Sequence, residues 1–372
     1  MAQDKRGKKK KYFDYQLLFL LIFLICFGMV MLYSATYYTA CLSSVSNYDD
    51  AFYLKQQLKN LAIAVVVFFM ALVFPYRLYK YLAFPAYIVS FLLSVLVLFI
   101  GKGANGSTRW IKLGPIRFQP SEIAKVATIM ILAYMISEAP KIMEKVNSLI
   151  KVGVMLGILI LPIALENLST AVIIAGIAFI MLFIESRKKF VFLLPILAGA
   201  AGVWLFINLA SYRMQRIAQW IHPEKYPDDA YQTLHGLYAI GSGGLFGKGL
   251  GNGTQKLGYI PEAQNDMIFS VICEELGIIG AICVLLLFAL ILYRMREIAM
   301  STTDLFASLL VIGVMAHVGL QVVLNVCVVT NLLPNTGVTL PFISYGGTSL
   351  MFLLAEFGVV FNVSLNVNLG LN

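Results

Sequence analysis

The sequence predicts an all-α integral membrane protein of about ten transmembrane helices. First, 60% of the 372 residues are hydrophobic and only 13% are charged, too few charges to cover the surface of a soluble domain of this length. Second, apolar runs of roughly 20 residues, the length that crosses a bilayer core, recur along almost the whole chain. Third, basic residues gather in short clusters between these runs, as membrane topology requires.

We place ten spans on the apolar runs. The first follows a basic tail, residues 1–12, and is longer than the apolar core of about 7–15 residues that a cleavable signal peptide carries. It also lacks a small-residue cleavage site, so we interpret it as a membrane span whose basic end lies in the cytoplasm. The predicted spans are 13–35, 58–75, 80–100, 119–137, 148–165, 168–185, 189–209, 266–292, 303–329 and 343–365.

Charge placement predicts the topology. With the N-terminus inside, the basic pairs or clusters at 77–80, 141–145, 187–189 and 294–296 all fall on the inner side, which satisfies the positive-inside rule. An even number of spans then puts both termini in the cytoplasm. The same placement argues against a nucleic-acid partner, despite a net charge of +9. The five cysteines show neither a disulfide framework nor metal-ligand spacing.

Two segments on the outer side stand apart. The loop 101–118 carries four basic residues against the positive-inside bias. Segment 210–265, between spans seven and eight, is too polar to cross a membrane, and loops longer than about 12–15 residues are usually functional or disordered. We therefore expect one polytopic membrane domain over residues 1–372, with a large extracytoplasmic loop at 210–265 and no soluble domain at either end.

Charges within spans need a physical reason, because each costs at least about 2.5–3.5 kcal/mol on insertion scales. Glu122 and Lys125 lie three residues apart in the fourth span and share a helix face. They form either a structural ion pair or the wall of a polar cavity with Lys125 directed at an anionic substrate. Glu356 lies within the last span, where packing and functional interpretations stand even.

Asp266 opens the eighth span shortly after Pro261, a residue that suits a helix start. One interpretation is a capping acid that gains from the helix dipole. The other is functional, because Asp266, Ser270 and Glu274 fall at i, i+4 and i+8 and make a polar stripe that a cap does not need. Glu275 lies on a neighbouring face. A third acid, Glu166, lies at the outer turn between spans five and six, where an interfacial position explains it.

The segment 241–253 is dense in glycine but does not match a Walker phosphate loop, since Ser242 and Gly249 occupy positions that need Gly and Ser or Thr. We expect a re-entrant or interfacial turn in which backbone approaches a ligand. The stretch 340–348 has a similar character, and Pro and Gly at membrane depth are tolerated where backbone lines a cavity.

Basic groups on the predicted outer half surround Asp266. Together they suggest an anionic ligand and a proton acceptor, for which phosphate binding and general-base catalysis are the natural pairing. These residues alone do not separate an enzyme from a transporter. The basic groups are Arg109, Lys112, Arg117, Lys125, Lys248 and Lys256.

Several long motifs together resemble the SEDS family (shape, elongation, division and sporulation), in order and over nearly the whole chain. The stretch around Gly249 and Lys256 is more similar to the division and sporulation branch (FtsW-like) than to the elongation branch (RodA-like). The motifs that carry the resemblance are 106–111, 118–125, 240–253, 259–266, 274–277 and 340–347.

The resemblance implies a ten-span peptidoglycan glycosyltransferase of the bacterial cytoplasmic membrane, serving cell division or cell shape. Its substrate is lipid II, a disaccharide-pentapeptide on undecaprenyl pyrophosphate. Its partners are a class B penicillin-binding protein and other proteins of the divisome or elongation complex. The family's essential acid matches Asp266, and Arg109, Trp110, Glu122 and Lys125 match its other site positions.

The implied chemistry fits these residues. Asp266 is expected to take a proton from the acceptor sugar hydroxyl, while basic groups, with Lys248 and Lys256 among them, stabilise the lipid pyrophosphate that leaves. An α donor linkage and a β product linkage require one inverting displacement. Trp110 packs either on sugar or lipid or as a plain interfacial anchor. No cofactor is implied, and since no set of acids has metal-ligand spacing, a requirement for a divalent cation stays open.

One position departs from the family pattern. Where many members have Pro-Asp-Leu-Gly-Thr after the fifth span, this chain has Glu166-Asn167-Leu168-Ser169-Thr170, so an acid needed there must come from Glu166.

Two other functions remain alternatives. A flippase for lipid-linked precursors is expected to tolerate Asp266→Asn. A scaffold that only recruits a transpeptidase is expected to tolerate loss of Asp266, Lys125 and Arg109 together.

Overall fold

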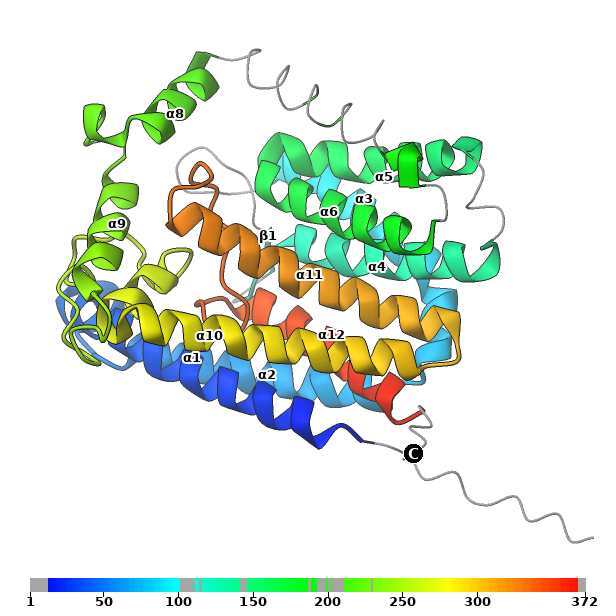
Figure 1. Cartoon of the computed structure of the whole chain (residues 1–372), viewed down its shortest axis with the longest axis horizontal. Coiled ribbons are helices and arrows are strands. Elements are labelled where there is room, and N and C mark those ends of the chain that lie inside the picture. The colour runs from blue at the N-terminus through cyan, green and yellow to red at the C-terminus, as the bar shows by residue number, and fades with distance from the viewer. Residues whose placement is uncertain are drawn as a thin grey trace, which may run out of the picture.

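The fold was analysed in a computed structural model of the chain (Figure 1). The structure describes residues 13–100, 111–113, 116–140, 146–186, 189–192, 199, 202, 211–228 and 230–366.

Long helices run side by side along one direction and form a bundle (Figure 1). Within the described residues, nine helices are long and apolar enough to cross a membrane. They are α1 (Tyr15–Leu42), α2 (Phe52–Val73), α3 (Tyr79–Ile100), α4 (Pro120–Glu138), α5 (Val146–Glu166), α6 (Leu168–Glu185), α10 (Ile268–Ser301), α11 (Leu305–Val329) and α12 (Gly347–Ser364).

These nine helices confirm nine of the ten predicted spans, with shifted boundaries. The first helix continues to Leu42 and the second begins at Phe52, because helical structure continues past the apolar core into more polar residues such as Lys55 and Gln57. The predicted span 189–209 falls largely outside the described residues, which there comprise the 3₁₀ turn η3 (Lys189–Phe192) and positions 199 and 202. That span stays a prediction.

Helix α11 lies at the centre of the bundle and packs against α4, α6, α10 and α12. Small residues let its neighbours come close: a Cβ on Gly313 would lie 2.4 Å from Ile129 Cγ2 of α4, and a Cβ on Gly176 of α6 would lie 2.7 Å from Leu320 Cδ1 of α11. Close approach at small residues is how helices associate where lipid supplies no hydrophobic driving force. The polar residues of α11 are therefore enclosed by protein rather than lipid.

Helices α2 and α12 form the most extensive pair in the bundle. At Gly358 a Cβ would lie 2.6 Å from the carbonyl oxygen of Phe68, so the two backbones touch. Asn362 fixes the end of this pair by donating to Leu72 O at 2.6 Å and accepting from Tyr76 N at 3.0 Å. A buried amide with both groups bonded stabilises the register of two otherwise apolar helices.

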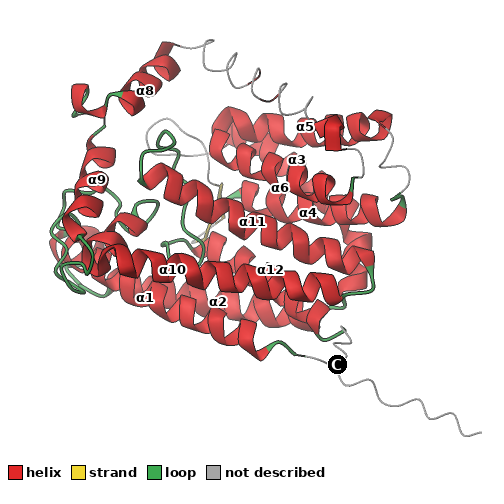
Figure 2. Ribbon diagram, viewed as in Figure 1, coloured by secondary structure: helices red, strands yellow, loops and turns green. Residues whose placement is uncertain are grey.

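The two ends of the bundle differ. At the end where α1 finishes and α10 begins, here called the Asp266 end, long loops and short elements gather, as the green segments on the left of Figure 2 show. The opposite end is closed by ion pairs between Arg294 and Asp14 (2.7 Å) and between Lys80 and Glu138 (2.8 Å). The short elements of the Asp266 end are β1 (Ile111–Leu113), β2 (Ile116–Phe118), α8 (Ser211–Ile221), α9 (Tyr231–Gly243) and the 3₁₀ turns η1 (Ser44–Ser46) and η4 (Pro223–Lys225), whereas the turn η2 (Tyr76–Leu78) lies at the opposite end.

The segment expected as one large loop, 210–265, contains local structure in its described part. It holds α8 and α9, followed by the glycine-dense segment 243–253, here called the glycine loop. That loop does not extend freely from the bundle but lies against the first turns of α10.

A break in α10 receives the glycine loop. Gly277 adopts φ 68° and ψ −170° within the helix, which interrupts the helical hydrogen bonds. The loop replaces them: the amides of Lys248 and Gly249 donate to the carbonyls of Glu274 and Glu275 at 2.9 Å. In return, the amides of residues 278 and 279 donate to carbonyls of residues 244 and 245.

The glycines are required because these are backbone-to-backbone contacts. A Cβ on Gly243 would lie 2.0 Å from Cys273 O, and one on Gly247 would lie 2.2 Å from Glu275 O. Gly247, Gly249 and Gly277 also have positive φ, which side chains rarely adopt. In the structure this backbone approaches α10, a partner that sequence spacing cannot identify, and its approach to a ligand stays a prediction.

We predict that Gly277→Ala lowers the melting temperature of the purified protein by several degrees. The new methyl group would lie 2.4 Å from Leu245 O at a strained φ, so the loop must leave the helix. Gly157→Ala on α5 is the matched control, because no atom lies within 4 Å of its added Cβ. An equal melting temperature for both variants would contradict the docking described here.

Candidate functional site at the Asp266 end

Asp266 lies in the turn that precedes α10, two residues before the helix begins at Ile268, and its side chain is half-buried. The amide of Gln232, from α9, donates to Asp266 Oδ1 at 3.3 Å. Gln232 is itself held, since Asn335 donates to its Oε1 at 3.0 Å. Gln232 therefore orients the carboxylate of Asp266, and Asn335 orients Gln232. A side chain held in this way is preorganised.

The main chain at Asp266 is fixed from α11. Asn325 donates through Nδ2 to the carbonyl of Asp266 at 2.8 Å and to that of Val338 at 2.7 Å. The carbonyl of Gln264 accepts from the amide of Tyr345 at 2.8 Å. The turn of Asp266 is thereby joined to α11 and to the 330–346 segment, which leads into α12.

The predicted polar stripe of Asp266, Ser270 and Glu274 is not a single helix face, because Asp266 precedes the helix. Ser270 turns back and donates to Met267 O at 2.6 Å. Glu274 is bonded by the glycine loop and the residues that follow it, so its oxygens do not serve Asp266. The correction has a simple cause: each polar side chain satisfies its nearest backbone or loop partner.

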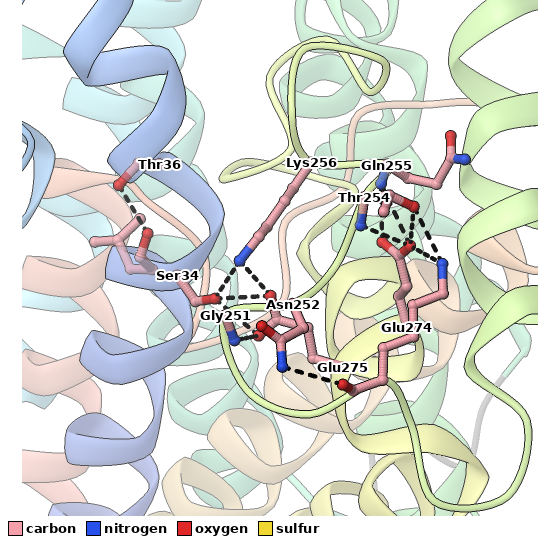
Figure 3. A network of polar contacts seen from close by, with 11 residues as sticks. Ser34, Thr36, Gly251, Asn252, Thr254, Gln255, Lys256, Glu274 and Glu275 are labelled. Atoms are coloured by element: carbon pink, nitrogen blue, oxygen red, sulfur yellow. Dashed lines mark hydrogen bonds and ion pairs between the residues drawn. The ribbon is translucent and has the colours of Figure 1, made fainter.

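Glu274 is enclosed by donors from the loop (Figure 3). Its Oε1 accepts from Lys248 Nζ at 2.6 Å and from the amide of Thr254 at 2.9 Å, and its Oε2 accepts from the amide of Gln255 at 3.1 Å. The Glu274 side chain is fully buried, whereas that of Lys248 is 30% exposed. A buried carboxylate with this many donors is satisfied as an ion.

Glu275 binds a second lysine in the interior (Figure 3). Its Oε1 accepts from Lys256 Nζ at 2.5 Å and from Ser34 Oγ of α1 at 2.8 Å, and its Oε2 accepts from the amide of Gly251. Lys256 also donates to Ser34 Oγ at 2.7 Å and lies over the ring of Tyr37. Both charged side chains of this pair are fully buried.

These contacts give Lys248 and Lys256 a structural setting that the sequence did not predict. Each neutralises one of two adjacent glutamates and so attaches the segment 243–256 to α10 and α1. Lys256 in particular has no exposed surface through which a substrate could reach its ammonium. The sequence predicted that Lys256 contacts the substrate, whereas the structure places it against Glu275. Spacing along the chain could not have identified this pairing.

Glu122 and Lys125 form the ion pair expected from their spacing, with Lys125 Nζ 2.9 Å from Glu122 Oε1. Both side chains are buried, at 7% and 3% exposed. Within the described residues, no group lies within hydrogen-bond distance of Glu122 Oε2. The ion pair expected from the sequence is therefore present, and Oε2 of Glu122 is available to another polar group.

Arg109 and Trp110 lie outside the described residues. The neighbouring residues form an antiparallel hairpin in which Ile111 pairs with Phe118. The ring of Phe118 lies 6.1 Å from that of Phe352 on α12, which places the hairpin against the same helix that follows Tyr345.

Glu166 ends α5, as predicted for the turn between the fifth and sixth spans. It lines a small pocket with Ser94, Gln119 and Ser121, at the start of α4. Asn167 accepts from Thr170 N at 3.3 Å and caps α6. An amide oxygen caps a helix about as well as a carboxylate, so the Asn at this position preserves the turn. A chemical role for Glu166 stays a prediction.

Four residues around the site were missed in the sequence: Gln232, Asn335, Asn325 and His317. Gln232 and Asn335 lie in polar segments, where one amide among many gives no signal. His317 and Asn325 did have one, since polar residues at i, i+4 and i+8 interrupt the apolar α11. The prediction considered charges within spans and did not consider amides or histidine.

The described residues contain no group of three or more His, Cys, Asp and Glu side chains arranged to hold a metal ion. A divalent cation has no ready-made site in this part of the chain.

Fold and site together define a multi-pass membrane protein with an oriented carboxylate at one end of its helical bundle. A family model for cell cycle proteins of the FtsW, RodA and SpoVE type matches residues 15–369. The chain belongs to this family, which confirms the resemblance drawn from the motifs.

The relatives agree along their whole length. A probable peptidoglycan glycosyltransferase FtsW of Geobacter sp. (strain M18) is 36% identical, covering 95% of this chain and 96% of its own. Stage V sporulation protein E of Bacillus subtilis (strain 168) is also 36% identical, with 96% and 98% covered. Both belong to the division and sporulation side of the family, as the motif around Gly249 predicted.

Two solved structures share the fold. One, described as structural coordination of polymerization and crosslinking by a peptidoglycan synthase complex, contains a chain with TM-score 0.81 and 28% identity, covering 96% of this chain and 99% of its own. The rod shape determining protein RodA of Thermus thermophilus gives a TM-score of 0.69 and 27% identity, with 95% and 96% covered.

We predict that Lys256→Met and Glu275→Gln each destabilise the protein, by about 3–5 kcal/mol for removal of one partner from a buried ion pair. The double variant should recover part of this loss, since neither charge is then left unpaired. Melting temperatures of the four proteins form a double-mutant cycle. Additive effects would mean that the two residues do not depend on each other.

Proposed function

We propose that this protein is a peptidoglycan glycosyltransferase that polymerises lipid II into glycan strands for cell division or cell-shape maintenance. The observation that carries the proposal is the placement of Asp266: half-buried, oriented by Gln232 and fixed to α11 at the end of a membrane bundle. The family membership and the names of the full-length relatives support the reaction class.

In the proposed reaction, Asp266 acts as the general base. It takes the proton from the acceptor sugar hydroxyl as that oxygen forms a bond with the anomeric carbon of the donor. The bond between that carbon and the pyrophosphate oxygen breaks, and the lipid pyrophosphate leaves with the electron pair. One displacement from the opposite face inverts the anomeric configuration, so no covalent enzyme intermediate is required.

The leaving pyrophosphate needs positive charge, which raises the question of which basic residues supply it. Lys248 and Lys256 are neutralised by Glu274 and Glu275. We assign this role to Arg109, together with Lys125, whose ion pair involves a single oxygen of Glu122, and a sugar or lipid contact to Trp110. Glu122 holds Lys125 in place at 2.9 Å. No step is routed through a metal ion.

The Asp266 end then faces the outside of the bacterial cytoplasmic membrane, where lipid II is polymerised, and both termini lie in the cytoplasm. A class B penicillin-binding protein is the proposed partner, within a divisome or elongation complex. The solved synthase complex, which is described as coordinating polymerization and crosslinking, supports a partner of this kind.

Asp266→Asn should lower lipid II polymerisation by at least about 10²-fold, the low end of what a general base contributes. The measurement is the yield of glycan strands from the purified protein with its class B partner. Asp228→Asn is the control, since it makes the same carboxylate-to-amide change at an exposed position before α9.

Each result separates the candidate functions. Equal polymer from wild type and Asp266→Asn would remove Asp266 from the mechanism. No polymer from either protein, with a demonstrably active partner, would favour a flippase or a scaffold. Movement of fluorescent lipid II across vesicles would then distinguish these two, because a scaffold moves none.

The orientation predicts that Cys41, exposed near the end of α1, reacts with a membrane-impermeant maleimide added to intact cells. The four other cysteines are replaced by alanine in this experiment. The matched control carries Ser301→Cys instead of Cys41, at the opposite end of α10, and should react only after permeabilisation. The reverse pattern would overturn the orientation.

A further inference from the structure

A buried acid–base pair lies in the middle of the bundle, and the proposed reaction does not use it. His317, on α11, places Nδ1 at 2.8 Å and 3.0 Å from the two carboxylate oxygens of Glu356, on α12. The two side chains are 0% and 2% exposed. Titratable groups within a span are costly, and a pair kept there calls for an explanation beyond packing.

The position of the ring hydrogen follows from the charge of Glu356. When Glu356 is an ionised carboxylate it can only accept, so the hydrogen between the two residues belongs to His317 Nδ1. In the neutral ring, Nε2 is then a bare acceptor, turned away from Glu356. A histidine oriented in this way by a carboxylate is suited to take up a proton at Nε2, because the carboxylate stabilises the resulting imidazolium.

Two amides continue from His317 along the same face of α11. Gln321 and Asn325 follow at i+4 and i+8, and their NH₂ groups donate to the Thr339 carbonyl and to the carbonyls of Asp266 and Val338. Within the described residues, no group lies within hydrogen-bond distance of His317 Nε2, Gln321 Oε1 or Asn325 Oδ1. The result is a row of three buried acceptors that ends at the turn of Asp266.

The spacing of the row suits water. Residues four apart on a helix are separated by about 6 Å along its axis. One water that donates to two acceptors, with two hydrogen bonds of about 2.8 Å each, bridges about 4.5 Å because its two O–H bonds are bent, so each step of the row needs one or two waters. Each buried acceptor left without a donor costs about 1–3 kcal/mol, so polar rows of this kind hold ordered water.

Most of the other charged side chains near α11 are bound to partners outside the row of His317, Gln321 and Asn325. Gly313 of α11 lies beside Ile129 of α4. One helical turn nearer the Asp266 end, the corresponding residues are His317 on α11 and Lys125 on α4, so these two lie at a similar depth in the bundle. Lys125 is paired with Glu122, the glutamates of α10 are bound by the loop segment, and Arg294 binds Asp14. The charged residues, histidines and cysteines on the helices packed against α11 are Glu122, Lys125, Glu138, Glu185, His235, Cys273, Glu274, Glu275, Cys283, Arg294, Arg296, Glu297 and Glu356.

We infer that His317, Gln321 and Asn325 line a water-filled path from Asp266 into the bundle, and that the His317–Glu356 pair is the group that receives the proton released by the transfer reaction. The inference rests on the proposed role of Asp266 as the base. The O–H bond of the acceptor hydroxyl breaks, and its proton binds the Asp266 carboxylate. The proton then passes through the waters to His317 Nε2, and Asp266 is again an anion for the next sugar. Between transfers the proton returns through the same waters to Asp266 and passes from its half-buried carboxyl group to bulk water, so that both groups are restored.

Water in the path is tested without the reaction. In a variant whose five cysteines are replaced by alanine, Gln321→Cys should react at least about tenfold faster with a small cationic methanethiosulfonate than Val311→Cys, because only ionised thiol reacts and ionisation needs water. Val311 is the matched control, buried to 0% on α11 but off the polar row. Modification is followed by mass spectrometry of the protein in nanodiscs. Equal rates would overturn the path.

The proton-receiving role is tested by the pH profile of lipid II polymerisation. His317→Gln should lower the rate at least about tenfold near pH 7, and the rate should recover as the pH rises, since hydroxide then removes the proton from Asp266 directly. Gln321→Leu should do the same, because it interrupts the path and leaves both titratable groups in place. Asn362→Leu, which removes a buried amide far from the path, should lower stability without changing the shape of the profile.

The outcomes separate the two proposals. An inactive Asp266→Asn together with a His317→Gln profile parallel to that of wild type would overturn the proton-receiving role and leave the glycosyltransferase intact. An active Asp266→Asn would overturn the base, while the thiol rates would still report on the path. A loss in His317→Gln that stays constant at every pH would mean a purely structural pair.

Discussion

The insertion of the glycine loop into the broken helix α10 is the contact on which the site depends. A helix that breaks within a membrane bundle exposes amides and carbonyls that lipid cannot satisfy, so the break at Gly277 requires a second backbone beside it. The loop provides that backbone, and its arrival brings Lys248 and Lys256 to the two glutamates that precede the break. Once the loop is attached, the turn that carries Asp266 has both of its ends fixed.

Helix α11 has the complementary role. It packs against α4, α6, α10 and α12. It also carries two amide side chains, Gln321 and Asn325, that bind the backbone of the loops at the Asp266 end. Asn325 holds the turn of Asp266, and Gln321 holds the segment before α12. A central helix with hydrogen-bonding side chains can therefore position residues from α9, α10 and α12 around one carboxylate, while the surrounding helices keep lipid away.

The hydropathy of the sequence was sufficient to place nine helices, because membrane spans are selected by length and apolarity, which are local properties. The Glu122–Lys125 pair was equally predictable, since both residues lie on one helix. Contacts between distant segments were not. Lys256 was assigned to a substrate because nothing in its neighbourhood shows that Glu275, nineteen residues later, lies beside it. For the same reason the glycine loop was expected near a ligand, and the Glu356 partner, His317, was missed thirty-nine residues away.

Docking through main-chain atoms leaves the apolar side chains of the loop free of contacts with α10, whereas Lys248 binds Glu274. Leu245, Phe246 and Leu250 point outward, at 61%, 79% and 54% exposed, while their backbone neighbours bind α10. Substitution there changes the surface that the protein presents without altering how the loop is held. The fold thus separates the attachment of the loop from its outer surface, so these exposed positions can be randomised in a library while the turn of Asp266 keeps its geometry.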